Sequence, residues 1–444
     1  MCEGPLFTNI IRYAFPFILT GFFQQLYNAA DVIVVGRYAG QEALAGVGTC
    51  GSLITFVLNL FLGLSMGVSV VMGNALGSKD SDRIKKTLHT SVLLSIIGGI
   101  FVAVFGFIFA EFLLKLISVP DDVMPQAKIY MQIIFLGKCP ALIYTFGIAI
   151  LRAKGDTKRP LYISLIAGLI NVGLNLIFVL KFKMAADGVA TATSISQLFS
   201  AVVVIYLLCR ETDNTKLELK KLHIHKRSLI DIVRIGVPSG LQSMVFSLSN
   251  ILVQSSVNTF GTAAIAGSSA SNNIGGFYYA ILHSMSQTTT AFVSQNMGAK
   301  KFDRISKTVK YSLIDMTFIS VVFVLLTVFA SEFLIGIYTP GNPEALRMGV
   351  IRLGLVGTFY GLCGFMEIMN GAIRGMRHAT STMFVSILGV CGIRIMWIFT
   401  VFKAIGTFES LFWCFPVSWG GTFLMQSVLY LFVRRHAEKK LHTV

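Results

Sequence analysis

The sequence predicts an all-α polytopic membrane protein, with twelve transmembrane helices in two six-helix lobes related by a parallel pseudo-two-fold repeat. Three observations predict this fold class. The 444 residues are 54% hydrophobic and 13% charged, with a mean hydropathy of +0.73, which excludes an ordinary soluble protein. Apolar runs long enough to cross a bilayer recur along the whole chain. Motifs of the first half also return in the second half at a nearly constant offset.

The apolar runs predict twelve spans of about 20 to 30 residues each, lengths that allow for tilt. The first six lie near residues 9–36, 42–72, 88–117, 123–151, 160–181 and 187–209. The other six lie near residues 229–258, 262–294, 308–337, 344–373, 380–402 and 408–433. The charged segment between these sets is typical of an exposed connection. The predicted domains are therefore an N-lobe (1–209), a cytoplasmic linker (210–228) and a C-lobe (229–444).

Lysine and arginine concentrate in alternate loops, which sets the predicted orientation. The basic loops lie near residues 79–86, 152–159, 210–228, 300–310 and 374–377, and the two termini belong to the same set. Because cytoplasmic loops of membrane proteins are rich in these residues, we expect both termini to be cytoplasmic. The same topology explains the net charge of +16 without a nucleic-acid partner. The first apolar run is too long for a cleavable signal, and the cysteines have neither paired nor metal-ligand spacing.

The two halves repeat each other in three places. IIRYAFP (10–16) matches DIVRIGVP (231–238), and GNALGSKDSDRIKKTLHTS (73–91) matches SQNMGAKKFDRISKTVKYS (294–312). ILRAKGDT (150–157) answers IRGMRHAT (373–380). Because each half contains six spans, both halves begin on the same side of the membrane. The repeat is therefore parallel. In such a protein we expect the substrate between the halves and transport by their rocking.

These residues resemble the multidrug and toxic compound extrusion (MATE) family, most closely its bacterial DinF-like branch. The resemblance rests on the two-lobe layout, LYNAADVIVVGRYAG (26–40), the paired G-[SA]-K-x-x-D-R-I-x-K-T loops and LRAKGDTKRP (151–160). It covers essentially the whole chain. The other twelve-span family considered, the major facilitator type, expects a G-x-x-x-D-R-x-G-R-R loop between spans two and three. That loop is absent here.

The resemblance implies a bacterial cell-membrane exporter of amphipathic, often cationic organic compounds, driven by inward H⁺ or Na⁺. Small organic molecules and membrane lipids are the implied partners, no cofactor beyond the coupling ion is expected, and a monomer is sufficient. In the DinF-like branch the ion site uses an acid on helix one, which matches Asp31, and a Thr on helix six, which matches Thr193. The N-x-x-x-D pattern of helix five reads Asn171 to Asn175 here, so the second acid is missing.

The residues themselves support this grouping. An ionised carboxylate inside hydrocarbon costs at least about 2.5 to 3.5 kcal/mol, so Asp31 needs a compensating role. Counted from the outer ends of their spans, Asp31, Asn175 and Thr193 fall at similar depth, and Asn171 lies one turn below Asn175 on the same face. Structural alternatives stay open, namely an acid satisfied by neighbouring helices and plain helix-to-helix hydrogen bonding.

A single carboxylate with amide and hydroxyl oxygens is either one protonation site or an oxygen cage for Na⁺ at Asp31 and Asn175, and we slightly favour H⁺. Pro16 stands at a bend-competent position of the first span, where it is either a functional kink or a tolerated proline. The acids that the NorM-like branch places on helix seven are absent.

Five further intramembrane polar residues are candidates for substrate contact or a second proton site. They are Gln24, Asn28, Lys138, Glu367 and Arg394. Glu367 is alternatively a structural partner of Arg394. Lys138 near mid-membrane either neutralises an acid, binds an anionic part of the substrate, or extends to the interface.

Two other functional classes remain as alternatives. A flippase for a lipid or lipid-linked precursor is related at superfamily level, but only Lys138, Arg352 and Arg394 are candidate intracavity cations. A membrane enzyme or channel is disfavoured because the histidines lie mostly in loops and no nucleophile or metal set is clustered. The sequence therefore predicts a transporter and no enzyme.

Overall fold

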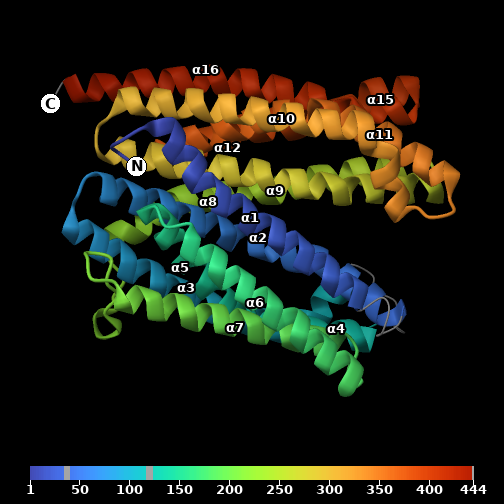
Figure 1. The fold of residues 1–444 in the computed structure, drawn as a ribbon, viewed down its shortest axis with the longest axis horizontal. Helices are drawn as coiled ribbons and strands as arrows, with labels where there is room; N and C mark the ends of the chain where they lie inside the picture. The colour runs from blue at the N-terminus through green and yellow to red at the C-terminus, as the bar shows by residue number, and fades with distance from the viewer. Residues whose placement is uncertain (35–40, 117–123, 443–444) are drawn as a thin grey trace. The chain divides into compact units, whose positions relative to one another are not determined.

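The computed structural model describes residues 1–34, 41–116 and 124–442 of the chain, without the side chains of residues 30–34, 41–49, 52–53 and 440–442. These ranges hold helices and no strands (Figure 1). The helices of the first half are α1 (Leu6–Val34), α2 (Gln41–Gly77), α3 (Ser81–Leu116), α4 (Met124–Leu136), α5 (Lys138–Lys154), α6 (Lys158–Leu176) and α7 (Ala186–Arg210). Those of the second half are α8 (Lys226–Asn258), α9 (Thr262–Gly298), α10 (Phe302–Tyr338), α11 (Pro343–Gly375), α12 (Ala379–Ser386), α13 (Ile393–Trp397), α14 (Lys403–Ile405), α15 (Phe408–Phe412) and α16 (Cys414–His442).

The predicted twelve-span layout is confirmed. In the described ranges nine helical segments are long and apolar enough to cross a membrane, and the bent pair α4 and α5 makes a tenth. The other two crossings are α9 and α16, with 37 and 29 residues. α9 carries more Ser, Thr, Asn and Gln than its neighbours, which lowers its hydropathy. The chain is therefore a multi-pass membrane protein.

Several helices extend further toward the basic loops than their apolar runs predict. α3 begins at Ser81 where its span was expected from residue 88, and α10 begins at Phe302 where its span was expected from residue 308. Hydropathy reports where the bilayer ends, whereas the backbone hydrogen bonds of a helix continue as long as the sequence favours them. Asp82 and Asp303 stand in the first turns, where a negative charge stabilises the helix N-terminus.

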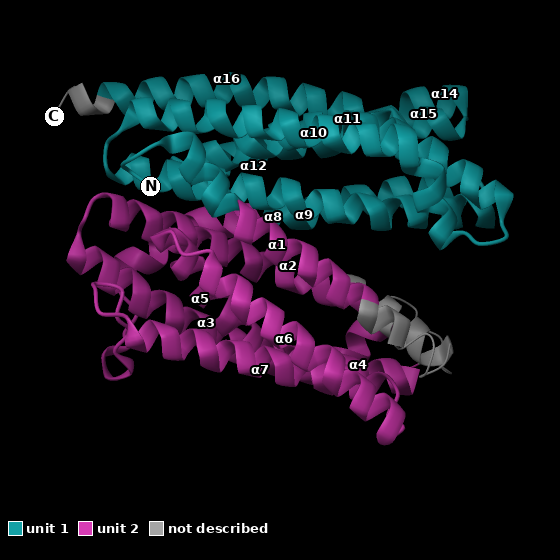
Figure 2. Cartoon of the chain, in the orientation of Figure 1, with its two compact units in different colours: residues 1–14, 241–444 teal, residues 15–240 magenta. Residues whose placement is uncertain are grey.

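The chain forms two compact units, coloured separately in Figure 2. Unit 1 comprises residues 1–14 and 241–444, and unit 2 comprises residues 15–240. Thus α1 begins in unit 1 and continues in unit 2, while α8 does the reverse. Both crossings lie within three residues of a helix proline, Pro16 or Pro238. The lobe bounds expected from sequence follow the repeat and stay a prediction.

The sequence repeat is also visible in the backbone. Left-handed residues occur at Lys79 and Lys300, which follow the paired glycines 77 and 298 of the repeated loop. A second pair is Gly155 and Arg377, each at the turn that follows the arginine of the third repeated motif. π-helical turns likewise occur at Ile177–Lys181 and Ile398–Phe402. Turns that share a backbone conformation at matching positions indicate one six-helix plan used twice.

The arginine of each repeated D-R-I motif holds the start of a crossing helix. In unit 2, Arg83 pairs with Asp231 near the start of α8 at 3.4 Å. In unit 1, Arg304 donates to the backbone carbonyls of Met1, Glu3 and Gly4 just before α1. Equivalent arginines therefore anchor the first helix of the opposite half of the sequence.

Glycines allow α2 and the first part of α8 to pack backbone to backbone within unit 2. A Cβ atom on Gly63 would lie 2.2 Å from the backbone nitrogen of Gly240 and 2.5 Å from the carbonyl oxygen of Gly236. Only residues without a side chain allow this approach. The contact fixes α8 against α2 up to the point where α8 leaves unit 2.

The segment that connects the two halves is docked on unit 2 through its charges. Glu211 accepts hydrogen bonds from Lys154 and Arg159, and Lys154 also pairs with Asp213 at 2.6 Å. Burial raises the pKa of Glu211, but the bonds from Lys154 and Arg159 outweigh burial and hold that pKa below its ordinary value. Burial opposes the same effect at Asp213, where bonds from Lys154 and Thr215 lower the pKa to about 2.

Candidate functional site

Three of the predicted ion-site residues form one hydrogen-bonded group in unit 2. The side-chain amide of Asn175 donates to Asn171 Oδ1 at 3.4 Å, and the amide of Asn171 donates to Thr193 Oγ1 at 3.2 Å. Asn171 and Asn175 lie one turn apart on α6, and Thr193 lies on α7. Asn175 is fully buried and Asn171 is 6% exposed. The group gathers amide and hydroxyl oxygens inside an apolar lobe.

Asp31, the fourth predicted ligand, belongs to α1, but its side chain lies outside what the structure describes. The described part of α1 contacts α6 through Tyr27, four residues earlier in sequence. The Tyr27 hydroxyl donates to the carbonyl oxygen of Leu165 at 3.2 Å, and its ring occupies the space that a Cβ on Gly168 would fill. Gly168 precedes Asn171 by three residues. Tyr27 therefore brings α1 to α6 next to the polar group.

Pro16 lies inside α1, as the sequence predicted, and it removes one backbone hydrogen bond from the helix. The buried hydroxyl of Thr20 donates to the carbonyl oxygen of Pro16 at 2.9 Å. The side chains of Gln24 and Asn28 are exposed, and Asn28 donates to Gln25 at 3.5 Å. These two residues do not join the group around Asn171.

Lys138 stands at the break in the fourth membrane crossing. It is the first residue of α5, where the axis bends by 41° from α4. Within the described ranges no carboxylate lies within ion-pair distance of its ammonium group. Lys138 is thus a cation in mid-membrane without a charged partner there.

Glu367 and Arg394 have separate partners in unit 1, so the structure does not bring them together as an ion pair. Glu367 on α11 is 7% exposed, and the Ser286 hydroxyl on α9 donates to its backbone oxygen at 2.8 Å and to its Oε2 at 3.3 Å. Arg394 donates to Asn250 Oδ1 at 2.9 Å and to Ser418 Oγ at 3.2 Å.

Two arginines in unit 1 are buried on aromatic rings. The guanidinium carbon of Arg394 lies 4.3 Å from the centre of the Phe415 ring, and that of Arg352 lies 4.9 Å from the centre of the Phe412 ring. Arg352 donates to the carbonyl of Ser268 and to Asn272. Neither arginine has a carboxylate within 4 Å among the described residues. Neutral oxygens and ring faces hold these charges.

Asp315 on α10 is an intramembrane acid that the sequence reasoning did not single out. Its Oδ2 is buried without a hydrogen-bond partner in the described part of the chain. The signal was available, because Asp315 is one of two acids in the apolar run of span nine, the other being Glu332. It was missed because no repeated motif or family pattern includes it.

Comparisons with known proteins define the class. A family model described as MatE matches residues 16–177 and 238–400. The probable multidrug resistance protein YoeA of Bacillus subtilis (strain 168) is 26% identical over 388 residues, which are 86% of this chain and 83% of that protein. The FAD transporter of Shewanella oneidensis is 22% identical over 369 residues, 81% and 80% of the two chains.

Solved structures share the fold. An outward-facing multidrug resistance MATE family transporter of the MOP superfamily superposes with a TM-score of 0.91 at 20% identity, covering 99% of this chain and 98% of that one. A MOP superfamily transporter from Pyrococcus furiosus, reported with a binding pocket of reverse polarity, gives a TM-score of 0.90 at 20% identity over 98% and 97%.

The fold and these relatives are those of a polytopic membrane transporter. The chain belongs to the MatE family, because the family model covers most of it and matches both repeats from Pro16 and Pro238 onward.

Proposed function

We propose that the protein is a secondary active exporter of amphipathic, often cationic organic compounds, driven by an inward gradient of H⁺ or Na⁺ and working by rocking of its two lobes. The observation that carries the proposal is the hydrogen-bonded group of Asn171, Asn175 and Thr193 in a chain of the MatE family. The names of relatives such as the multidrug resistance protein YoeA support the substrate class.

Asp31 is the proposed coupling acid. The contact of Tyr27 with Leu165 and Gly168 supports this role, because one more turn along each helix leads toward Asp31 and Asn171. A carboxylate beside two amides and a hydroxyl can take a proton or complete an oxygen shell for Na⁺. With one acid in the group, we favour a single H⁺.

The protein acts in this proposal as a monomer in a bacterial cell membrane, with both termini in the cytoplasm and no cofactor other than the coupling ion. The loops that carry the paired D-R-I motifs then face the cytoplasm, as their lysines and arginines favour.

A flippase for a lipid or lipid-linked precursor is the second candidate function. It is favoured by three intramembrane cations without a carboxylate partner in the described ranges, Lys138, Arg352 and Arg394. Such groups suit an anionic substrate better than a cationic one. The reverse-polarity pocket reported for the Pyrococcus furiosus structure and the name of the Shewanella oneidensis FAD transporter support an anionic substrate, not a lipid in particular.

The test is transport by the purified full-length protein in liposomes. A fluorescent organic cation is followed under an imposed pH gradient and, separately, an imposed Na⁺ gradient, and movement of a fluorescent phospholipid between leaflets is followed in parallel. We expect movement of the organic cation under one gradient and no acceleration of lipid exchange. Lipid exchange without gradient-driven movement of the cation would replace the exporter by the flippase.

A further inference from the structure

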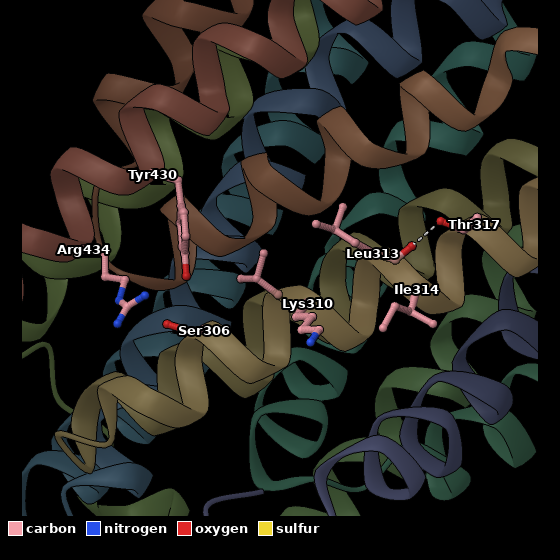
Figure 3. Close-up of a pocket in the computed structure, with 8 residues that line it drawn as sticks. Ser306, Lys310, Leu313, Ile314, Thr317, Tyr430 and Arg434 are labelled. Atoms are coloured by element: carbon pink, nitrogen blue, oxygen red, sulfur yellow. Dashed lines mark hydrogen bonds between the residues drawn. The ribbon is translucent and has the colours of Figure 1, made fainter.

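A groove on unit 1 lies between α10 and α16 (Figure 3). Its lining residues are Ser306, Val309, Lys310, Leu313, Ile314, Thr317, Tyr430 and Arg434. Figure 3 shows polar Ser306, Tyr430 and Arg434 at one end and Leu313, Ile314 and Thr317 at the other. None of these residues belongs to the candidate transport site.

Two cations and a buried hydroxyl line the groove, with Arg434 and Tyr430 at its polar end and Lys310 between the two ends (Figure 3). Lys310 is exposed, and no carboxylate lies within ion-pair distance of it in the described part of the chain. In the described part of the chain Arg434 pairs with Glu438 on the next turn, at 2.9 Å. Tyr430 is 6% exposed, and its hydroxyl lies near Ser306 of α10. An oxygen entering beside Arg434 would find these donors together.

The other end of the groove is apolar. The Thr317 hydroxyl donates to the carbonyl oxygen of Leu313 at 2.9 Å, so it is satisfied within its own helix. Beyond it, α10 exposes Phe318 and Val321 to 75% and 53%, a surface that only lipid covers in a membrane. The groove therefore runs from a polar end into the hydrocarbon layer.

The polar end lies at the basic end of both helices. α10 starts at Phe302 after the loop of Lys300 and Lys301, and α16 ends in RRHAEKK (434–440). In the orientation proposed above this is the cytoplasmic side, where anionic headgroups attract lysine and arginine.

We propose that this groove binds one anionic phospholipid of the cytoplasmic leaflet. The phosphate lies between Lys310 and Arg434, the Tyr430 hydroxyl donates to a phosphate oxygen, and one acyl chain lies along Leu313 and Ile314. The proposal rests on the proposed orientation and is independent of the transported substrate and of the coupling ion.

Binding is measured by native mass spectrometry of the full-length protein, titrated with phosphatidylglycerol or with phosphatidylcholine of the same acyl chains. The groove variant K310Q/R434Q is compared with the control variant K307Q/R435Q. The control removes the same charge from the same helices, one turn or one residue away, at positions that do not line the groove. Y430F removes only the hydroxyl, and inorganic phosphate is added as a competitor.

We expect the wild type and the control to bind phosphatidylglycerol in preference to phosphatidylcholine. K310Q/R434Q loses that preference at least tenfold, because each basic contact near an anionic lipid contributes about fivefold. Y430F weakens the binding of phosphatidylglycerol by a smaller factor and leaves the binding of phosphatidylcholine unchanged. If the groove and control variants lost the preference for phosphatidylglycerol equally, the proposal would be overturned. The preference would then come from general surface charge.

Displacement of the lipid by inorganic phosphate alone would also overturn it, since the site would then be one for free phosphate. If the double variant does not fold, the single variant K310Q replaces it. We expect K310Q to lose part of the preference for phosphatidylglycerol. Because no transport is measured, failure of the export proposal leaves this result unaffected.

Discussion

At the residue scale, the described part of the candidate site consists of neutral polar groups. Asn171 is its central member, because it accepts from Asn175 and donates to Thr193. Amides and hydroxyls at these positions hold α6 and α7 together whether or not an ion binds. Their role in coupling can therefore be separated from their role in packing only by measuring both export and stability.

We predict that Asn171→Leu abolishes gradient-driven export while most of the protein still folds. Leucine has a similar size but can neither donate nor accept, and each lost hydrogen bond costs about 1 kcal/mol of stability. Export per folded molecule is measured in liposomes, together with the thermal unfolding midpoint.

The control for Asn171→Leu is Asn258→Leu, which changes an exposed residue at the end of α8. It should export normally. If Asn171→Leu lowers only the unfolding midpoint and exports at the wild-type rate, the group has a packing role alone.

The sequence was informative about which residues are polar inside the membrane, and less so about their partners. Helical rise placed Asn175 level with Thr193, whereas in the structure Thr193 accepts from Asn171, one turn away, and Asn175 bonds to Asn171. Helical rise places Arg394 about 10 Å nearer the outer face than Glu367, which disfavours a direct pair. It does not reveal the partners that α8, α9 and α16 supply, which are Asn250, Ser286 and Ser418. Neutral partners on other helices leave no signal in one sequence.

At the element scale, helix contacts in unit 2 depend on glycine at particular positions. We predict that Gly63→Ala lowers stability by about 1 to 3 kcal/mol, because the new Cβ meets the backbone of α8 and the helices must separate. The matched change Gly354→Ala, where nothing lies within 4 Å, should be neutral or stabilising by up to about 1 kcal/mol.

Unfolding of both glycine variants is followed under one set of conditions in the same detergent. Equal midpoints would show that α2 and α8 do not pack as closely as Gly63 and Gly240 indicate.

The charged connection between the halves should depend on pH. The pKa of Asp213 is lowered to about 2 in the folded protein, and Glu211 is shifted in the same direction. Depressed pKa values mean that the ionised carboxylates stabilise the docked segment at pH values above about 4, the ordinary range of these groups, and that the effect is lost as pH falls toward 2.

Amide hydrogen exchange of residues 211–215, corrected for the intrinsic rate, is the measurement for that segment. We expect constant protection from pH 7 to pH 5 and a loss below about pH 4. Loss of protection already between pH 7 and pH 5 would contradict a role for these two carboxylates.

The positions of the helices could be predicted well because each helix contains an apolar run. The ends of the helices could not be predicted where the helices continue into the basic loops. The bend at Gly137 and Lys138 had a sequence signal that was not used. Pro140 cannot donate to the carbonyl of Leu136, the last residue of α4, and Gly137 stands at the break.

At the scale of the whole molecule, the two halves of the sequence are not identical with the two compact units. α1 and α8 each begin in one unit and continue in the other. Near each crossing a hydroxyl bonds to a carbonyl four residues back, Thr20 to Pro16 and Ser239 to Ile235, an arrangement that often bends helices. The repeat predicted two equivalent six-helix sets, but not that the start of each first helix belongs to the other unit.

The measurement that tests the proposed function most directly compares the wild type with Asp31→Asn and with Glu332→Gln, an exposed acid of α10, in the same liposome assay. We expect export of the organic cation under one ion gradient in the wild type and in Glu332→Gln, and none in Asp31→Asn. Export by Asp31→Asn under either gradient at the wild-type rate would contradict the role of Asp31 and move the search for the coupling acid to Glu367.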